Sequence, residues 1–137
     1  MTILVDTSVW YAALDRSDRS HSRAARILAE EHDLLVTDHV MVEAHRLADH
    51  RLGRKVADAY LSTLLSGAVD IEVVNRTDLE HASRIRQAFP DQGFSLVDCT
   101  SFSVMERRRL DAVATFDVDF SIYRYGPGLR RAFQIIN

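Results

Sequence analysis

Cysteine, glycine, proline and lysine are all scarce in this sequence. The single cysteine, Cys99, excludes a disulfide within the chain and suits a reducing cytosol. With only five glycines and two prolines, the sequence has no linker or low-complexity stretch, and we expect one domain over residues 1–137. Sixteen of the 17 basic residues are arginine, and the one lysine, Lys55, argues against the usual lysine-dependent chemistries.

Long apolar runs and an excess of positive charge are also missing. No run approaches the ~20 residues that a membrane-spanning helix needs. The first apolar run is interrupted by Asp6, so no secretory leader is expected, and the protein should be cytoplasmic. A net charge of −3 is unusual for a protein that holds nucleic acid through its overall field. RNA binding would therefore depend on local arginine patches and on metal ions.

Short apolar segments alternate with helical patterns along the chain. Strands are expected at residues 2–5, 34–37, 69–74, 111–116 and 133–136. Helices are expected just after Asp6 and at about 19–31, 38–51, 54–66, 77–89 and 95–108. The alternating segment 69–74 is typical of a sheet edge. The whole pattern predicts a three-layer α/β/α sandwich with a mostly parallel sheet.

Four acidic residues are placed where such a sheet would gather them. Asp6 and Asp117 follow apolar strands directly, and ligands of open parallel sheets bind beyond the carboxyl ends of the strands. Glu43 lies within the apolar stripe of its helix, where a carboxylate is costly unless it is paired or binds a metal. Asp98 falls in the first turn of another helix. All four could converge on one edge of the sheet.

Carboxylates packed together in this way raise one another's pKa unless cations intervene. Oxygen ligands of this kind select Mg²⁺ or Mn²⁺. Two such ions about 4 Å apart can activate water and stabilise the leaving oxygen of a phosphodiester. The placement of the acids therefore predicts metal-dependent phosphodiester hydrolysis.

Each acid also has a purely structural interpretation. Asp6 could cap the first helix, as Thr7 or Ser8 also could. The pattern Ser95-x-x-Asp98 is a capping box, which occurs at many helix starts. Glu43 could reach solvent from a shallow stripe, and Asp117 could be an ordinary turn residue. For Asp119 we expect an outer or solvated position.

Four motifs, in order, resemble those of the VapC toxins, which are PIN-domain ribonucleases. They are Val5-Asp6-Thr7-Ser8-Val9-Trp10, the acid Glu43 after the second strand, Phe94-Ser95-Leu96-Val97-Asp98, and Ala114-Thr115-Phe116-Asp117-Val118-Asp119-Phe120. The resemblance implies a five-stranded parallel sheet and a Mg²⁺- or Mn²⁺-dependent endoribonuclease. It assigns metal binding and catalysis to Asp6, Glu43, Asp98 and Asp117, and to Thr7 or Ser8 a hydroxyl that orients a metal-bound water. It also implies a growth-inhibiting toxin, a homodimer, and a VapB-type antitoxin that covers the acidic groove.

Two other fold families place an acid after the first strand, and both fit poorly. A haloacid-dehalogenase phosphatase needs a second aspartate at position 8, where this chain has Ser8, and a later lysine. A phospho-receiver needs an acidic pair after the first strand and a lysine after the last. A PIN-like module that binds RNA or a partner protein without cleavage stays open.

The remaining candidate residues have more ordinary expected roles. Arg107, Arg108 and Arg109 are expected to be solvated cations at a helix end, with phosphate binding as the alternative. Three further arginines could form an RNA-binding edge: Arg124, Arg130 and Arg131. Trp10 and Tyr11 are expected to be core or interface anchors rather than base-stacking platforms. The histidines have no spacing that suits zinc.

Overall fold

The computed structural model describes residues 1–30 and 33–137, and its centre is a five-stranded sheet. The strands are β1 (Thr2–Val5), β2 (Asp33–Thr37), β3 (Asp70–Glu72), β4 (Ala112–Ala114) and β5 (Gln134–Ile136). They lie in the order β3-β2-β1-β4-β5, and every pair is parallel. The predicted parallel sheet is confirmed, with β3 at one edge as the alternating segment indicated.

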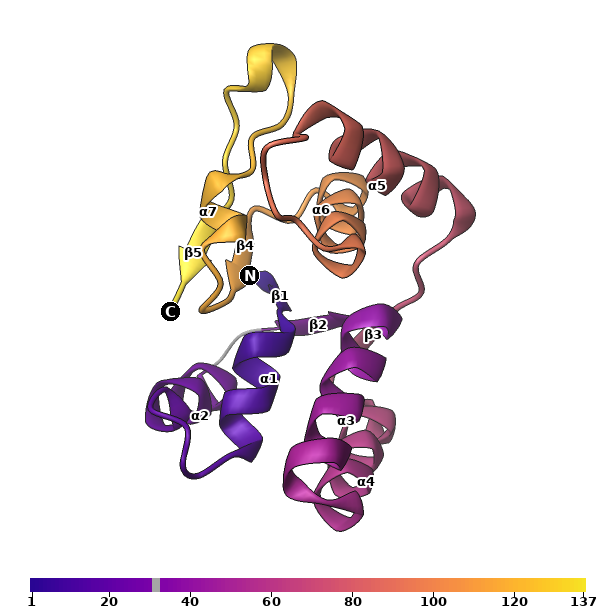
Figure 1. The fold of residues 1–137 in the computed structure, drawn as a ribbon. Helices are drawn as coiled ribbons and strands as arrows, with labels where there is room; N and C mark the ends of the chain where they lie inside the picture. The colour runs from indigo at the N-terminus through magenta and orange to yellow at the C-terminus, as the bar shows by residue number, and fades with distance from the viewer. Residues whose placement is uncertain (31–32) are drawn as a thin grey trace.

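Helices cover both faces of this sheet (Figure 1). On one side lie α1 (Thr7–Leu14), α2 (His21–Ala29), α3 (Asp38–Leu52) and α4 (Arg54–Thr63), which continues into a π-helical turn (Leu64–Ala68). On the other lie α5 (Arg76–Ala88), α6 (Leu96–Arg108) and α7 (Asp119–Ile122). A 3₁₀ turn (Pro127–Leu129) precedes β5. The three-layer α/β/α arrangement predicted from the sequence is confirmed.

Alternation along the strands divides the core into two clusters. Ile3 and Val5 point into the cluster that α1 to α4 cover, whereas Leu4 points into the cluster beneath α5 and α6. Successive strand residues face opposite sides of a sheet, so an unbroken apolar run is what a strand buried on both faces requires. Trp10 is 6% exposed and donates its indole N–H to the Val5 carbonyl at 3.1 Å, which confirms it as a core anchor.

The residues that cap α3 and α5 lie just before each helix. At α3 the N-cap is Thr37, whose hydroxyl accepts the Val40 N–H at 3.0 Å, while the Asp38 side chain accepts the Val74 N–H at 2.9 Å. At α5 the N-cap is Asn75, so this helix begins at Arg76, one residue before the expected start at 77. Thr37 ends a buried strand, and Asp38 is used to tie the chain after β3 to the start of α3. Local sequence alone does not distinguish adjacent polar residues that can both cap.

The end of α6 is tied to α5 and β3 by ion pairs. The Arg107 guanidinium donates to both carboxylate oxygens of Asp78, at 3.0 and 2.8 Å, and to Glu72 at 2.6 Å. Arg108 pairs with Glu72 and, at 3.5 Å, with Asp70. The expectation of solvated helix-end cations is therefore wrong for Arg107 and Arg108. Their charges are already matched by acids of the same chain.

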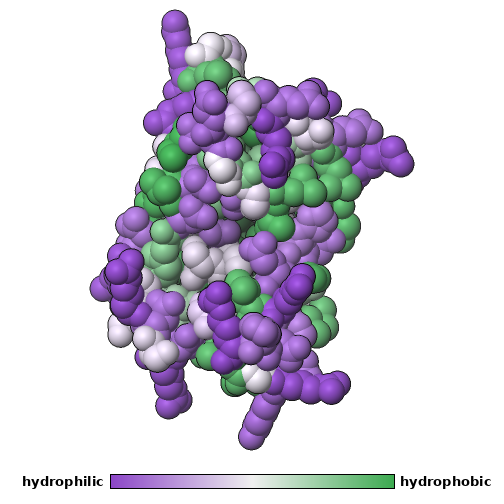
Figure 2. All heavy atoms as spheres, viewed as in Figure 1, coloured by the Kyte–Doolittle hydropathy of each residue, from purple (hydrophilic) through white to green (hydrophobic). Residues whose placement is uncertain are grey.

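The surface visible in Figure 2 is mostly hydrophilic, with hydrophobic side chains in small patches between the polar ones. Among the described residues, no helix combines the length and the apolar character needed to span a membrane.

Candidate active site

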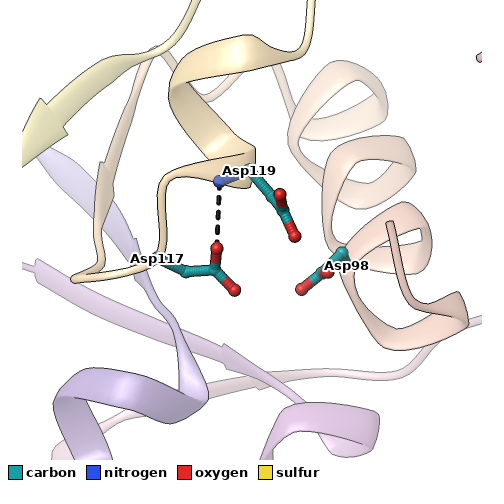
Figure 3. A group of neighbouring side chains, drawn as sticks. All are labelled: Asp98, Asp117 and Asp119. Carbon is teal, nitrogen blue, oxygen red and sulfur yellow. Dashed lines mark hydrogen bonds between the residues drawn. The ribbon is translucent and has the colours of Figure 1, made fainter. Parts of the chain in front are cut away.

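Acidic side chains from two segments meet beyond the carboxyl ends of β1 and β4. Asp98 comes from the first turn of α6, Asp117 follows β4, and Asp119 is the first residue of α7. Each offers a carboxylate oxygen, and the three oxygens lie within 4.8 Å of one another. Figure 3 shows the three side chains directed toward a common space.

Asp98 and Asp117 of this group line an open cavity of about 400 Å³. The four acids predicted from the sequence all contribute to its wall: Asp6, Glu43, Asp98 and Asp117. The predicted convergence on one site is thus present in the fold. The residues that the structure describes contain one tight group of three possible ligands, and it includes Asp119 in place of Asp6 and Glu43. Asp119 therefore lies closer to the centre than the outer position expected for it.

Hydroxyl groups fix the position of Asp6. Ser8 Oγ and Thr115 Oγ1 both donate to Asp6 Oδ2, at 3.0 and 2.9 Å. The same hydroxyls accept backbone N–H groups, Ser8 from Phe116 at 3.0 Å and Thr115 from Asp117 at 2.9 Å. The ends of β1 and β4 are therefore joined by side chains as well as by the sheet. Thr115 was missed in the sequence, where its signal is one hydroxyl residue closing an apolar strand.

Asp98 has two roles at once. Its Oδ2 accepts the Ser95 N–H at 3.0 Å, and Ser95 Oγ accepts the Asp98 N–H at 3.0 Å. The capping box inferred from the sequence is confirmed. It also fixes the carboxylate, which still faces Asp117 and Asp119. Asp119 N–H in turn donates to Asp117 Oδ1 at 2.9 Å, which holds that side chain.

Burial makes this cluster costly in its charged form. Burial raises the pKa of Asp98 to about 7, and the charges of Asp6 and Asp117 add to the effect. The pKa of Asp6 is also raised by burial, against the opposing hydrogen bonds from Thr115 and Ser8. Burial and the neighbouring Asp117 raise the pKa of Asp119. The cluster therefore favours the binding of protons or cations.

The donor set fits a hard divalent cation. All the possible ligands are carboxylate oxygens, the type that Mg²⁺ and Mn²⁺ prefer. The Thr7 hydroxyl, which also borders the cavity, is buried with no hydrogen-bond partner in the described chain. A buried hydroxyl without a partner is uncommon in a folded protein.

We expect metal-free protein to be less stable at about pH 8 than at about pH 5.5, by about 2 kcal/mol from Asp98 alone. The folded-state pKa of Asp98 is raised above its ordinary value of 3.8, so its stabilising contribution is complete below that value. The contribution is lost as the pH rises through about 7. Asp98→Asn should remove this dependence, because asparagine does not ionise. Its side-chain oxygen can still accept the Ser95 N–H, so the helix cap is kept. Thermal denaturation in EDTA measures the effect.

The matched control is Asp91→Asn, which removes a charge from an exposed turn. It should leave the pH dependence as in the unaltered protein. Mn²⁺ added at about pH 8 should restore the stability of the unaltered protein but not that of Asp98→Asn. Equal pH dependence in Asp98→Asn and the unaltered protein would contradict the assignment of the buried charge.

Comparisons with known proteins agree with this geometry. Residues 3–124 match the model of the PIN domain family. The chain is 34% identical over 120 residues to the 23S rRNA-specific endonuclease VapC20 of Mycobacterium tuberculosis, covering 87% of this chain and 92% of that protein.

Solved structures show the same similarity. The crystal structure of M. tuberculosis VapC20, described as a sarcin–ricin loop cleaving toxin, superimposes with a TM-score of 0.83 at 32% identity, over 88% of this chain and 93% of that one. The FitAcB structure from Neisseria gonorrhoeae gives a TM-score of 0.69 at 16% identity, over 100% and 97% of the two chains. At that identity the likeness concerns the fold alone.

Proposed function

Because this chain belongs to the PIN-domain family, among the VapC toxins, we propose that it is a divalent-metal-dependent endoribonuclease whose active site is the acidic cavity. The observation that carries the proposal is the meeting of Asp98, Asp117 and Asp119 within 4.8 Å. Three carboxylates so close together in a partly buried place are costly without a cation. The fixed Asp6 beside them extends the same negative surface.

The acids and the hydroxyl groups of the site have different proposed roles. Asp98, Asp117 and Asp119 would hold Mg²⁺ or Mn²⁺, with Asp6 and Glu43 as further ligands or as acceptors for bound water. When bound, the metal supplies a water of lowered pKa and offsets charge on the phosphate. Ser8 and Thr115 keep Asp6 in place by hydrogen bonds to its carboxylate. No covalent intermediate with the chain is needed.

The substrate we propose is ribosomal RNA, because the relative that is 34% identical to this chain over 120 residues is named as a 23S rRNA-specific endonuclease. Structural neighbours include toxin–antitoxin complexes, so we also propose a VapB-type antitoxin as partner. A homodimer and a cytoplasmic location complete the proposal. The competing function is a PIN-like module that binds RNA or protein without cutting it.

Purified protein incubated with ribosomal RNA and Mn²⁺ tests the proposal directly. We expect discrete cleavage products in Mn²⁺, none in EDTA, and none with Asp6→Asn in Mn²⁺. Asparagine keeps the shape of Asp6 and an acceptor for Ser8 and Thr115 but removes the charge. Expression in a bacterial host should likewise arrest growth for the unaltered chain and not for Asp6→Asn.

Two outcomes separate the alternatives. Cleavage that persists in both EDTA and the Asp6→Asn protein would eliminate the metal-dependent mechanism. RNA binding without cleavage, in the presence of Mn²⁺ and with several structured RNAs tried, would favour the binding module.

A further inference from the structure

The acidic cavity creates an electrostatic problem for its own substrate. RNA carries a negative charge at every phosphate, and this chain has a net charge of −3 with several carboxylates at the site. Affinity for a nucleic acid backbone comes mainly from cations that neutralise phosphates. Bound metal offsets only the centre of the cavity. Cationic side chains are therefore required at its rim.

Three arginines near the cavity are available for this role. Arg19 and Arg51 contribute to the cavity wall, and the Arg23 guanidinium lies over the ring of Phe116, which also lines it. Within the described part of the chain none of the three forms an ion pair with an acid. Arg107 and Arg108, in contrast, are fully engaged with acids on another side of the fold.

Two of these arginines are stacked on aromatic rings of the cavity wall. The Arg51 guanidinium carbon lies 5.3 Å from the centroid of the Tyr11 ring, and that of Arg23 lies 4.9 Å from the centroid of the Phe116 ring. Such contacts hold a planar guanidinium over the ring while its N–H groups stay available around the edge. A cation that is already positioned loses less conformational freedom when it binds a phosphate.

Hydrogen bonds fix one ring and one arginine of these two pairs. The Tyr11 hydroxyl donates to Asp15 Oδ2 at 2.9 Å, and the opposite oxygen of Asp15 accepts from Ser17. The Tyr11 ring is therefore held in the wall of the cavity. Arg23 also donates to Ser20 Oγ at 3.0 Å.

The two pairs approach the site from different elements. Arg23 is on α2 and Arg51 in the last turn of α3, and α1 packs against both of these helices (Figure 1). Phe116 immediately precedes Asp117, whereas Tyr11 follows Ser8 on α1 by about one turn. The two guanidinium groups thus come from two different helices that both pack against α1, and each lies over a ring that lines the cavity.

We propose that Arg23 and Arg51, each stacked on an aromatic ring of the acidic cavity, bind backbone phosphates of the RNA next to the phosphate that is cleaved. Both arginines are positioning residues for the substrate. This proposal rests on the proposed ribonuclease function. Arg19 supplies additional positive charge at the same rim. Specific contacts to bases are not needed for this role, since phosphate contacts position the strand without reading its sequence.

Binding of a short fluorescein-labelled single-stranded RNA, measured by anisotropy in EDTA over a series of salt concentrations, tests the proposal without any metal. Arg23→Ala and Arg51→Ala should each weaken binding by about five- to tenfold and reduce the slope of log K against log salt by about 0.7. Arg51→Lys should restore the slope but only part of the affinity, because an ammonium group keeps the charge without the planar contact.

Two matched controls remove the same charge close by. Arg26→Ala lies one turn further along α2, and Arg54→Ala removes an exposed arginine beside the end of α3 whose partner is Asp58. Both should change affinity by less than about twofold and leave the salt slope unchanged. Arg23 and Arg51 variants that behave like these controls would overturn the proposal, as would an absence of salt-dependent RNA binding by the unaltered protein.

Cleavage assays in Mn²⁺ distinguish this proposal from the proposed function. The variants should raise KM with little change in kcat, because the arginines act beside the reacting phosphate rather than on it. RNA held through these arginines but never cleaved would refute the nuclease and retain the phosphate contacts. Metal-dependent cleavage with unaltered KM in both variants would support the nuclease and refute the phosphate contacts of the two arginines.

Discussion

Asp117→Asn should lower the rate of RNA cleavage in saturating Mn²⁺ by roughly a thousandfold, since charge stabilisation by a bound metal contributes several kcal/mol. Asp117 is the acid around which the site is built: it faces Asp98 and accepts the Asp119 N–H, and its own N–H is held by Thr115. Asparagine preserves an acceptor for the Asp119 N–H but removes the charge. Single-turnover cleavage of ribosomal RNA provides the rate.

The control for this loss is Asp49→Asn, which removes a charge from the exposed side of α3 and should leave the rate within about twofold. Calorimetric titration with Mn²⁺ should show weaker binding for Asp117→Asn. For Asp119→Asn we expect metal binding about 10- to 100-fold weaker, the range for residues that ligate or orient a metal. Normal Mn²⁺ affinity in both variants would show that the tight acidic group is not the metal site.

The position of the main acids followed from rules that are local in the sequence. Asp6 ends one apolar run and Asp117 follows another, and parallel strands bring their carboxyl ends to the same edge of a sheet. The Ser95-x-x-Asp98 pattern marks a helix start, which in this fold lies at that edge. The parallel sheet and its two helical layers follow similarly from short apolar segments that alternate with helical patterns. These features need only the identity of each element and its direction.

Other features of the site depend on contacts between segments that lie far apart in the sequence. The hydrogen bond from Thr115 to Asp6 spans 109 positions, and nothing in either segment alone specifies it. Asp119 was expected at the periphery of the site. Its side-chain direction depends on where α7 begins, which the sequence of this segment does not specify. The pairing of Arg23 with Phe116 is of the same kind. Such contacts are set by tertiary packing.

The arginines at the end of α6 show how packing changes the role of a residue. Cations are favourable near any helix C-terminus, which suggested solvated side chains. In the fold, β3 and the start of α5 bring Glu72 and Asp78 to the same place. Asp78 is only 1% exposed, and its charge must be matched there. Arg107 is therefore important for stability because it neutralises the buried Asp78 carboxylate.

Arg107→Ala should destabilise the protein by about 3–5 kcal/mol, because it leaves the Asp78 carboxylate buried without its cation. Burial alone would raise the pKa of Asp78, yet the hydrogen bonds and charge of Arg107, together with the Asn75 N–H, hold it below its ordinary value. The matched control is Arg108→Ala, which loses only ion pairs near the surface and should cost less than about 1 kcal/mol. Urea denaturation at about pH 7 measures both.

A second variant separates the loss of charge from the loss of packing. Asp78→Asn combined with Arg107→Ala leaves no buried charge, so the double variant should be more stable than Arg107→Ala alone. With its single oxygen, asparagine can still accept the Asn75 N–H, and its amide group can donate to the Ser103 hydroxyl, which now donates to the other oxygen of Asp78. Since α5 and β3 lie away from the acidic cavity, the folded fraction of each variant should retain metal-dependent cleavage. A double variant as unstable as Arg107→Ala would attribute the cost to lost packing of the arginine side chain.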